Sequence, residues 1–195
     1  MSHSLVNKPP SVKRGTVSAR KITTARQQVV KWFEDKDWKP FRFQRQAWNS
    51  YLNGESGLIH ASTGTGKTLA AWMGVVIEGL AEQKPLKPSP KSGRIPKQTR
   101  RHTPPTRVLW LTPLRALAAD TLGALNRPVE DLGLRWSVES RTGDTTSAVR
   151  SRQSGRLPTV LVTTPESLSL LLSRPDTKAQ FDDLRSVSYT HLTLP

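Results

Sequence analysis

The chain has 195 residues, with 30 Lys and Arg against 15 Asp and Glu for a formal net charge of +15, and this length suits one domain but not two complete ones. It contains no Cys, which excludes disulfides and thiolate metal sites. No apolar run approaches the ~18 to 20 residues of a membrane span and the N-terminus has no signal-peptide core, so we expect a cytoplasmic protein without a membrane partner.

The positive charge is concentrated in two segments. Residues 1–26 carry six basic and no acidic side chains, and residues 84–107 carry eight and none, so together they supply fourteen of the fifteen net charges. Both are poor in large apolar residues, and the second contains six prolines, so we expect a disordered tail and a disordered loop. Two interpretations stay open: salt-dependent attraction of a polyanion, or an insertion without a dedicated partner.

Two amphipathic helices are predicted next. Residues 24–36 have helical apolar spacing, and after Pro40 a second helix is expected from about Phe43 to Leu52. We expect Trp32, Trp38 and Trp48 to lie in the core.

Gln44 precedes Lys67 by about twenty residues, and its amide can both donate to and accept from an adenine edge. Phe41 and Phe43 beside it are candidates for stacking on a base, and the alternative is an ordinary surface glutamine.

Residues 57–70, GLIHASTGTGKTLA, predict a short apolar strand, a glycine loop and a helix start. Gly64 and Gly66 permit a tight loop whose N–H groups face a phosphate chain. Lys67 adds a charge against the outer phosphates, and the Thr68 hydroxyl is placed to bind magnesium. Ala61 replaces the first glycine of the usual pattern, so a plain helix-capping loop is the alternative.

Three further strands are predicted, each followed by a turn or helix start. They are residues 107–112, 134–139 and 159–163, RVLWLT, LRWSVE and TVLVT. Arg115 begins a helix after the first and is a candidate phosphate contact, because ligands bind at the carboxyl ends of parallel strands. Arg141 to Asp144 form a turn before a helix from Thr145. Thr164 is an expected N-cap, which explains TTPES without any function.

The order of these segments resembles the first motor domain of a superfamily-two helicase. FRFQRQAW, GLIHASTGTGKTLA, VLWLTPLRALAAD, RTGDT and LVTTPESLSLLLSRP are similar to the large helicase-related family, specifically the ligase-associated DExH-box helicases, over about residues 30–187. The resemblance implies an α/β, RecA-like P-loop domain with a mostly parallel sheet and helices on both faces, incomplete at the C-terminus. It divides the chain into a tail at 1–26, a motor domain at 27–187 with the loop at 84–107, and a non-family tail at 188–195.

The resemblance also assigns roles, with ATP and Mg²⁺ as cofactors. It places Lys67 and Thr68 in catalysis and Thr68 on the metal. Nucleotide binding is assigned to Gln44, Ser62, Thr63, Gly64, Thr65, Gly66, Lys67 and Thr68. Contacts to single-stranded DNA, or to a duplex with a single-stranded tail, are assigned to Thr112, Pro113, Arg115, Thr142, Gly143, Asp144, Thr164 and Pro165. The branch implies ATP-driven unwinding in DNA repair, with ligase-linked repair proteins as partners.

One departure from the family limits the expected activity. After Val187 the family continues into Asp-Glu-x-His, whereas this chain reads SYTHLTLP, so we expect a fragment that binds nucleotide without hydrolysing it. Asp182 and Asp183 precede that strand and would lie at its wrong end. Two other classes stay open: a P-loop kinase or other NTPase, and a non-enzymatic basic nucleic-acid-binding protein.

Overall fold

The computed structural model describes residues 17–62, 64–84 and 103–190; the expectations for residues 1–16, Thr63, 85–102 and 191–195 lie outside the described residues. The elements follow the order α1 (Ala19–Glu34), α2 (Arg42–Leu52), α3 (Lys67–Glu82), β1 (Val108–Leu111), α4 (Arg115–Asp131), β2 (Val138–Arg141), α5 (Ser147–Gly155), β3 (Val160–Thr163), α6 (Pro165–Leu172), the 3-10 helix η2 (Pro175–Phe181) and β4 (Ser186–Tyr189).

The described strands form one parallel sheet in the order β2-β3-β1-β4. In register, Trp110 of β1 lies opposite Val162 of β3 and Ser188 of β4. Because all strands run the same way, the segments that follow β1, β2 and β3 meet at one edge of the sheet.

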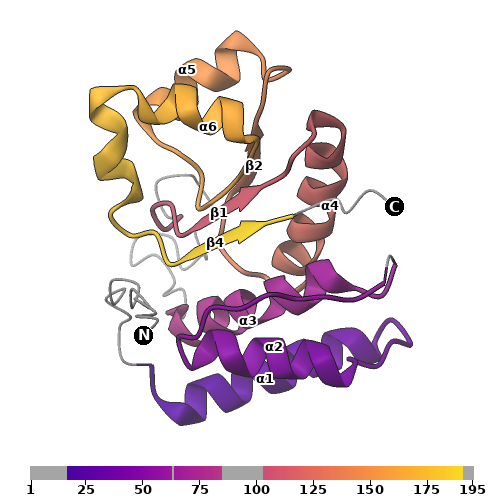
Figure 1. The fold of residues 1–195 in the computed structure, drawn as a ribbon. Coiled ribbons are helices and arrows are strands. Elements are labelled where there is room, and N and C mark those ends of the chain that lie inside the picture. The colour runs from indigo at the N-terminus through magenta and orange to yellow at the C-terminus, as the bar shows by residue number, and fades with distance from the viewer. Residues whose placement is uncertain (1–16, 63, 85–102, 191–195) are drawn as a thin grey trace, which may run out of the picture.

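Helices cover both faces of this sheet, as Figure 1 shows, with α1, α2 and α3 stacked below it and α5 and α6 above. Alternating strand residues explain the layers: Trp110 and Val162 face a large core shared with α1 to α4, while Leu109 and Leu161 face a smaller core with α6. The expected α/β fold with helices on both faces is thus confirmed.

A cluster of ion pairs fixes the direction of α3. Glu82, at the end of α3, accepts from Arg107 at 2.5 Å and from Arg185, residues that directly precede β1 and β4. Arg185 also lies 3.6 Å from Glu78, which accepts from Tyr51 of α2 at 2.6 Å. The C-terminus of α3 therefore lies where the strands begin, and its N-terminus points toward the side where they end.

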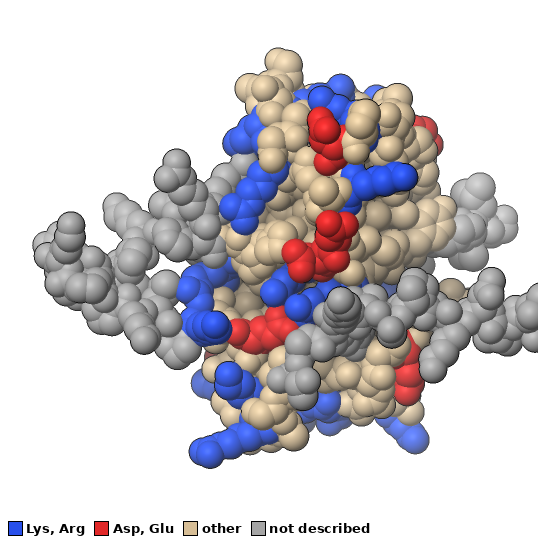
Figure 2. Space-filling model, turned by 90° about the vertical axis from the view of Figure 1, so that its left-hand side faces the viewer, with Lys and Arg blue, Asp and Glu red and all other residues tan. Residues whose placement is uncertain are grey.

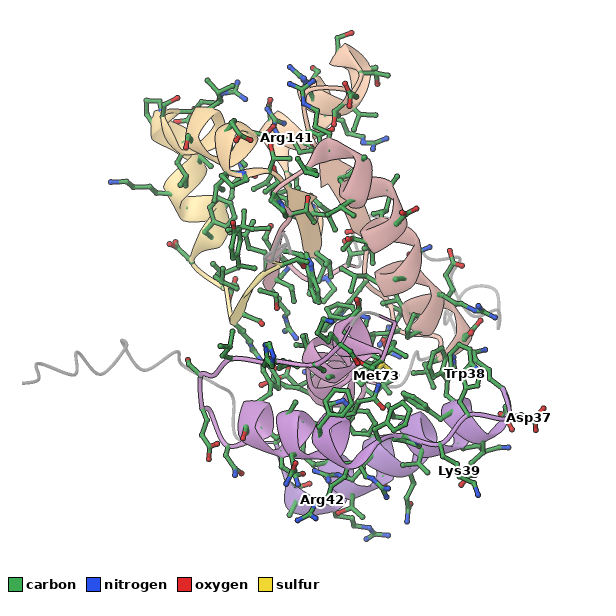
Figure 3. All side chains as sticks on the ribbon, turned by 45° about the vertical axis from the view of Figure 1, so that its right-hand side comes forward. Asp37, Trp38, Lys39, Arg42, Met73 and Arg141 are labelled. Atoms are coloured by element: carbon green, nitrogen blue, oxygen red, sulfur yellow. The ribbon has the colours of Figure 1, made fainter. Side chains whose placement is uncertain are left out.

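The helices predicted before the glycine loop are present, but the boundary of the tail was placed too late. Ala19 to Arg26, expected to be disordered, form the first two turns of α1, because Ile22 and Ala25 pack on the core. Trp32 and Trp48 are buried as expected. Trp38 is 44% exposed, so the core prediction was wrong for it; it lies in the turn beside Asp37 (Figure 3).

Two strand predictions need correction. Residues 57–61 form no strand in the described structure, and Leu58 is 92% exposed, since an extended segment without a ladder partner does not build a strand. The strand expected at 134–139 begins only at Val138. Leu134 and Trp136 are buried for another reason: they pack in the core, where Trp136 fits against Gly79 of α3.

At the C-terminal end, β4 crosses the boundary expected at Val187. Ser188 and Tyr189 pair in register with Trp110 and Leu111, so they belong to the sheet and not to a separate tail. Asp182 and Asp183 precede β4, as the sequence indicated. Among the described helices, none combines the length and apolar character that crossing a membrane requires.

Candidate functional site

The loop before α3 has the backbone that its glycines predict. Gly64 has φ 79° and Gly66 φ 81°, both left-handed, and Gly66 is the N-cap of α3. A β-carbon on Gly66 would also come within 2.6 Å of the Gln44 Nε2 atom. Conformation and space therefore both require glycine at position 66.

Lys67 folds back over this loop. Its Nζ donates to the carbonyl oxygens of Ala61 at 2.6 Å and Ser62 at 2.7 Å, and the Thr65 hydroxyl donates to the same Ser62 oxygen at 2.7 Å. The N-terminus of α3 has no side-chain cap, so the N–H groups of its first turn have no side-chain acceptor. A cation beside uncapped helix N–H groups is an arrangement suited to phosphate.

Gln44 connects α2 to the glycine loop. Its side chain is 2% exposed, its Nε2 donates to the Gly66 carbonyl at 3.0 Å, and its Oε1 accepts from the Phe41 N–H at 2.8 Å. The alternative of an ordinary surface glutamine is therefore wrong. Phe41 and Phe43 stack on each other with centroids 5.9 Å apart, and Phe41 stays 58% exposed beside the loop-contacting glutamine.

A pocket of 580 Å³ lies at the carboxyl ends of β1, β2 and β3. Five of the residues predicted to contact nucleic acid line it: Pro113, Arg115, Thr142, Gly143 and Thr164. The structure does not bring the other three to its wall, which are Thr112, Asp144 and Pro165. Thr112 is fully buried, and its hydroxyl donates to the Leu114 carbonyl at 3.3 Å.

Arg115 and the turn after β2 are in contact at the pocket mouth. Arg115 Nη1 lies 3.4 Å from Asp144 Oδ1, with both side chains largely exposed. The pKa of Glu166 at the same wall is lowered, mainly by the backbone N–H of Glu166, then by the Thr164 hydroxyl and, more weakly, by the charge of Arg115. Arg115 is thus the basic group at the mouth, with two carboxylates beside it.

Helix starts were well predicted here, with one shift. Thr164 caps α6, accepting from the Ser167 N–H at 3.4 Å, and Pro165 is its first residue. The helix after the Thr142 turn begins later than expected: Thr146 is the N-cap, while Thr145 accepts from the Thr142 N–H at 2.8 Å.

Several pocket residues were missed by sequence reasoning. They are Leu114, Ala116, Arg141, Arg150, Glu166, Ser167 and Leu170. The sequence predicts Arg141 as part of the turn and gives it no binding role. Arg150 stands on α5, where Arg152 lies two residues away, and nothing in the local sequence distinguishes the two.

The glycine loop and the pocket both lie at the end of the sheet where the strands finish. The pocket is at the carboxyl ends of the strands. Helix α3 is antiparallel to the strands, so it starts at the same end (Figure 1). The end of the domain where the strands finish therefore presents the glycine loop and a separate basic pocket.

Comparison with known proteins agrees with this arrangement. The sequence pattern of the DEAD/DEAH box helicase family matches residues 41–190. The chain is 36% identical over 152 residues to the Lhr helicase/probable uracil glycosylase of Mycolicibacterium smegmatis, covering 73% of this chain and 9% of that protein. It is 31% identical over 172 residues to the ATP-dependent helicase Lhr-Core of Methanothermobacter thermautotrophicus, covering 82% and 18%. The chain thus spans less than a fifth of these two relatives.

Solved structures show the same fold. A structure of Mycobacterium smegmatis helicase Lhr bound to ssDNA and AMP-PNP matches with a TM-score of 0.59 and 29% identity, covering 90% of this chain and 20% of that one. DUF1998 helicase MrfA bound to DNA and AMPPNP matches with a TM-score of 0.62 at 20% identity, covering 90% and 21%.

Proposed function

The chain belongs to the DEAD/DEAH box helicase family, and from that premise we propose that the described domain binds ATP at the loop before α3 and a nucleic-acid strand at the pocket beyond β1, β2 and β3. One observation carries the proposal: the glycine loop and the basic pocket both lie at the end of one parallel sheet where its strands finish. A P-loop kinase would not need the basic pocket, and a simple basic nucleic-acid-binding protein would not need the glycine loop.

In this proposal, Gln44 would exchange its contacts with the Phe41 N–H and the Gly66 carbonyl for the adenine edge, and the residues of the glycine loop hold the phosphates. These are Ser62, Thr63, Gly64, Thr65, Gly66 and Lys67. The Lys67 ammonium donates to the carbonyl oxygens of Ala61 and Ser62, and a phosphate oxygen would replace these acceptors on binding. Thr68 would give Mg²⁺ one hydroxyl ligand. Because Mg²⁺ prefers six oxygen ligands, the others would come from phosphate and water.

Nucleic-acid contacts are proposed for the pocket wall. Arg115 supplies the charge, and Pro113, Thr142, Gly143 and Thr164 shape the surface that the strand crosses, with Pro165 following Thr164 at the start of α6. Thr112 would act from beneath, since its hydroxyl holds the Leu114 carbonyl. Asp144 would act through Arg115, because a carboxylate repels a phosphate.

The wider activity concerns a protein longer than this domain. We propose that the domain is the first motor domain of an ATP-driven DNA helicase that acts on single-stranded DNA or a tailed duplex. We further propose a place in cytoplasmic DNA repair with ligase-linked partners. The two helicase relatives described above are much longer than this chain, and unwinding needs domains that open and close over nucleotide.

The nucleotide site is tested by titrating the chain with a fluorescent ATP analogue. Lys67→Ala removes the ammonium from the loop, so we expect the analogue to bind at least tenfold more weakly. Lys39→Ala is the matched control, because Lys39 is an exposed lysine in the segment between α1 and α2 and should leave the affinity unchanged. Equal affinities of the two variants would overturn the assignment of the glycine loop to ATP.

A further inference from the structure

Three arginines gather between α5, the end of β2 and the start of η2. Arg141 ends β2, Arg150 lies on α5 and Arg174 directly precedes η2. Arg141 and Arg150 line the pocket, and Arg174 donates to the Ser154 hydroxyl of α5 at 2.8 Å. Figure 3 places Arg141 in the upper part of the molecule, away from Met73 in the core below the sheet.

Among the described residues, these arginines have no carboxylate partner. Within residues 17–62, 64–84 and 103–190, the ion pairs involve other residues, and Arg141, Arg150 and Arg174 donate only to carbonyl, amide and hydroxyl oxygens. Burial lowers the pKa of Arg141, and the charges of Arg174 and Arg150 lower it further. On the face drawn in Figure 2, which is the left-hand side of Figure 1, acidic and basic side chains are intermixed.

Arg150 also determines the shape of the pocket. Its Nη2 donates to the carbonyl of Thr142 at 3.0 Å and to that of Gly143 at 2.7 Å. The guanidinium has five donors in a planar fork, so the group that holds these two carbonyls keeps N–H groups for a ligand. One side chain thus fixes the turn after β2 and lines the pocket beside it.

We propose that Arg150, supported by Arg141, forms a phosphate subsite in this pocket, so that the bound strand places one backbone phosphate there and contacts Arg115 at the mouth. The inference rests on the proposed function, because it assigns a ligand group within the same site. A phosphate diester would offset the repulsion between Arg141 and the neighbouring Arg150 and Arg174. Its oxygens would accept hydrogen bonds from the remaining N–H groups of Arg150. Because the contact is to a phosphate, binding at this subsite does not depend on the base sequence.

The chain offers a matched control on the same helix. Arg152 is also an exposed arginine of α5, but its guanidinium pairs with Glu139 at 3.1 Å and does not line the pocket. Arg150→Gln and Arg152→Gln therefore remove the same charge from the same helix. Arg150→Lys keeps the charge and loses the fork.

The experiment measures binding of fluorescein-labelled dT12 by anisotropy over a range of KCl concentrations. We expect Arg150→Gln to weaken binding about tenfold and to reduce the slope of log K against log[KCl] by about one. Arg152→Gln should change the affinity less than about twofold and keep the slope. Arg150→Lys should bind less tightly than wild type with the wild-type slope, because its ammonium still meets the phosphate.

The salt slope distinguishes a lost phosphate contact from a folding defect. A constant unfolded fraction lowers the apparent affinity but leaves the slope of log K against log[KCl] unchanged. If Arg150→Gln weakens binding with the wild-type slope, or if Arg150→Lys loses the slope as well, Arg150 only shapes the turn and the subsite is wrong. Arg115→Gln tests the proposed function separately. Should it lose affinity while Arg150→Gln behaves like Arg152→Gln, the subsite fails and the strand site stands. Wild-type binding by Arg115→Gln would overturn both.

Discussion

The guanidinium of Arg115 occupies the space that a side chain on Gly143 would take. A β-carbon built on Gly143 would lie 2.3 Å from Arg115 Cζ and 2.6 Å from each terminal nitrogen. The two residues come from different segments, the start of α4 and the turn after β2. The missing side chain of Gly143 is therefore what permits Arg115 to lie at the pocket mouth.

Replacing Gly143 with Ala should weaken strand binding without weakening the fold. Arg115 is exposed and flexible, so its guanidinium can move away from the new methyl group at little cost in unfolding free energy. We expect the thermal midpoint to change by less than about 2 °C and the affinity for dT12 to fall several-fold, toward that of Arg115→Gln.

Gly123→Ala is the control for this prediction. Gly123 lies in α4, and a β-carbon there meets nothing within 4 Å. Alanine should raise the free energy of unfolding by about 0.5 to 1 kcal/mol through helix propensity and leave the affinity unchanged. Unchanged dT12 binding by Gly143→Ala would show that the position of Arg115 is irrelevant to the strand.

The sequence predicted best those elements whose signal is local. The buried runs of β1 and β3 and the Thr164 cap of α6 were found at nearly their observed positions. The start of β2 was not, because Trp136 is buried by packing on Gly79 of α3, and an apolar pattern does not tell ladder pairing from packing. The role of Arg150 depends on which of two similar arginines faces the turn, which only the fold determines.

Gln44→Glu should loosen the nucleotide loop. A carboxylate can still accept from the Phe41 N–H, but it cannot donate to the Gly66 carbonyl, so two acceptor oxygens would face each other at a site that is 2% exposed. We expect the free energy of unfolding to fall by about 1 to 3 kcal/mol and the ATP analogue to bind more weakly. Urea unfolding and analogue titration measure the two effects.

Gln46→Glu makes the same change on the exposed side of α2 and should alter neither quantity. A Gln44→Glu variant as stable as Gln46→Glu would mean that the contact with Gly66 contributes nothing.

Asp131 should make stability depend on acid pH. Hydrogen bonds from Lys36, then from the Trp32 indole N–H, hold the pKa of this carboxyl below its usual value of 3.8. A lowered folded-state pKa gives stability that is fully present above the unfolded pKa and is lost as the pH falls through the folded value. Asp131→Asn should therefore be less stable than wild type at pH 7, and the difference should shrink below about pH 4.

Urea unfolding at pH 7 and pH 3 tests this, with Asp120→Asn on the same helix as the control. Asp120 is exposed, so its substitution should change the free energy of unfolding little at either pH. A wild-type to Asp131→Asn difference that stays constant between the two pH values would contradict the assigned role of the carboxylate.

Glu82→Gln should destabilise the domain without changing its nucleotide site. Glu82 is the acceptor shared by Arg107 and Arg185, and all three side chains are less than 20% exposed. Burial opposes the charge of Arg185, but Glu82 and Glu78 hold its pKa above the usual value. Removing one anion takes the carboxylate from the partly buried Arg107 and leaves Arg185 with Glu78 alone, which costs about 3 kcal/mol.

The cluster lies at the C-terminal end of α3, and the glycine loop lies at the other end. Folded Glu82→Gln should therefore bind the ATP analogue as wild type does, while the urea midpoint falls. Glu55→Gln, an exposed control, should leave both unchanged. A loss below about 1 kcal/mol would place Glu82 among surface ion pairs, and a loss of nucleotide affinity in the folded variant would mean that the cluster acts on the loop through α3.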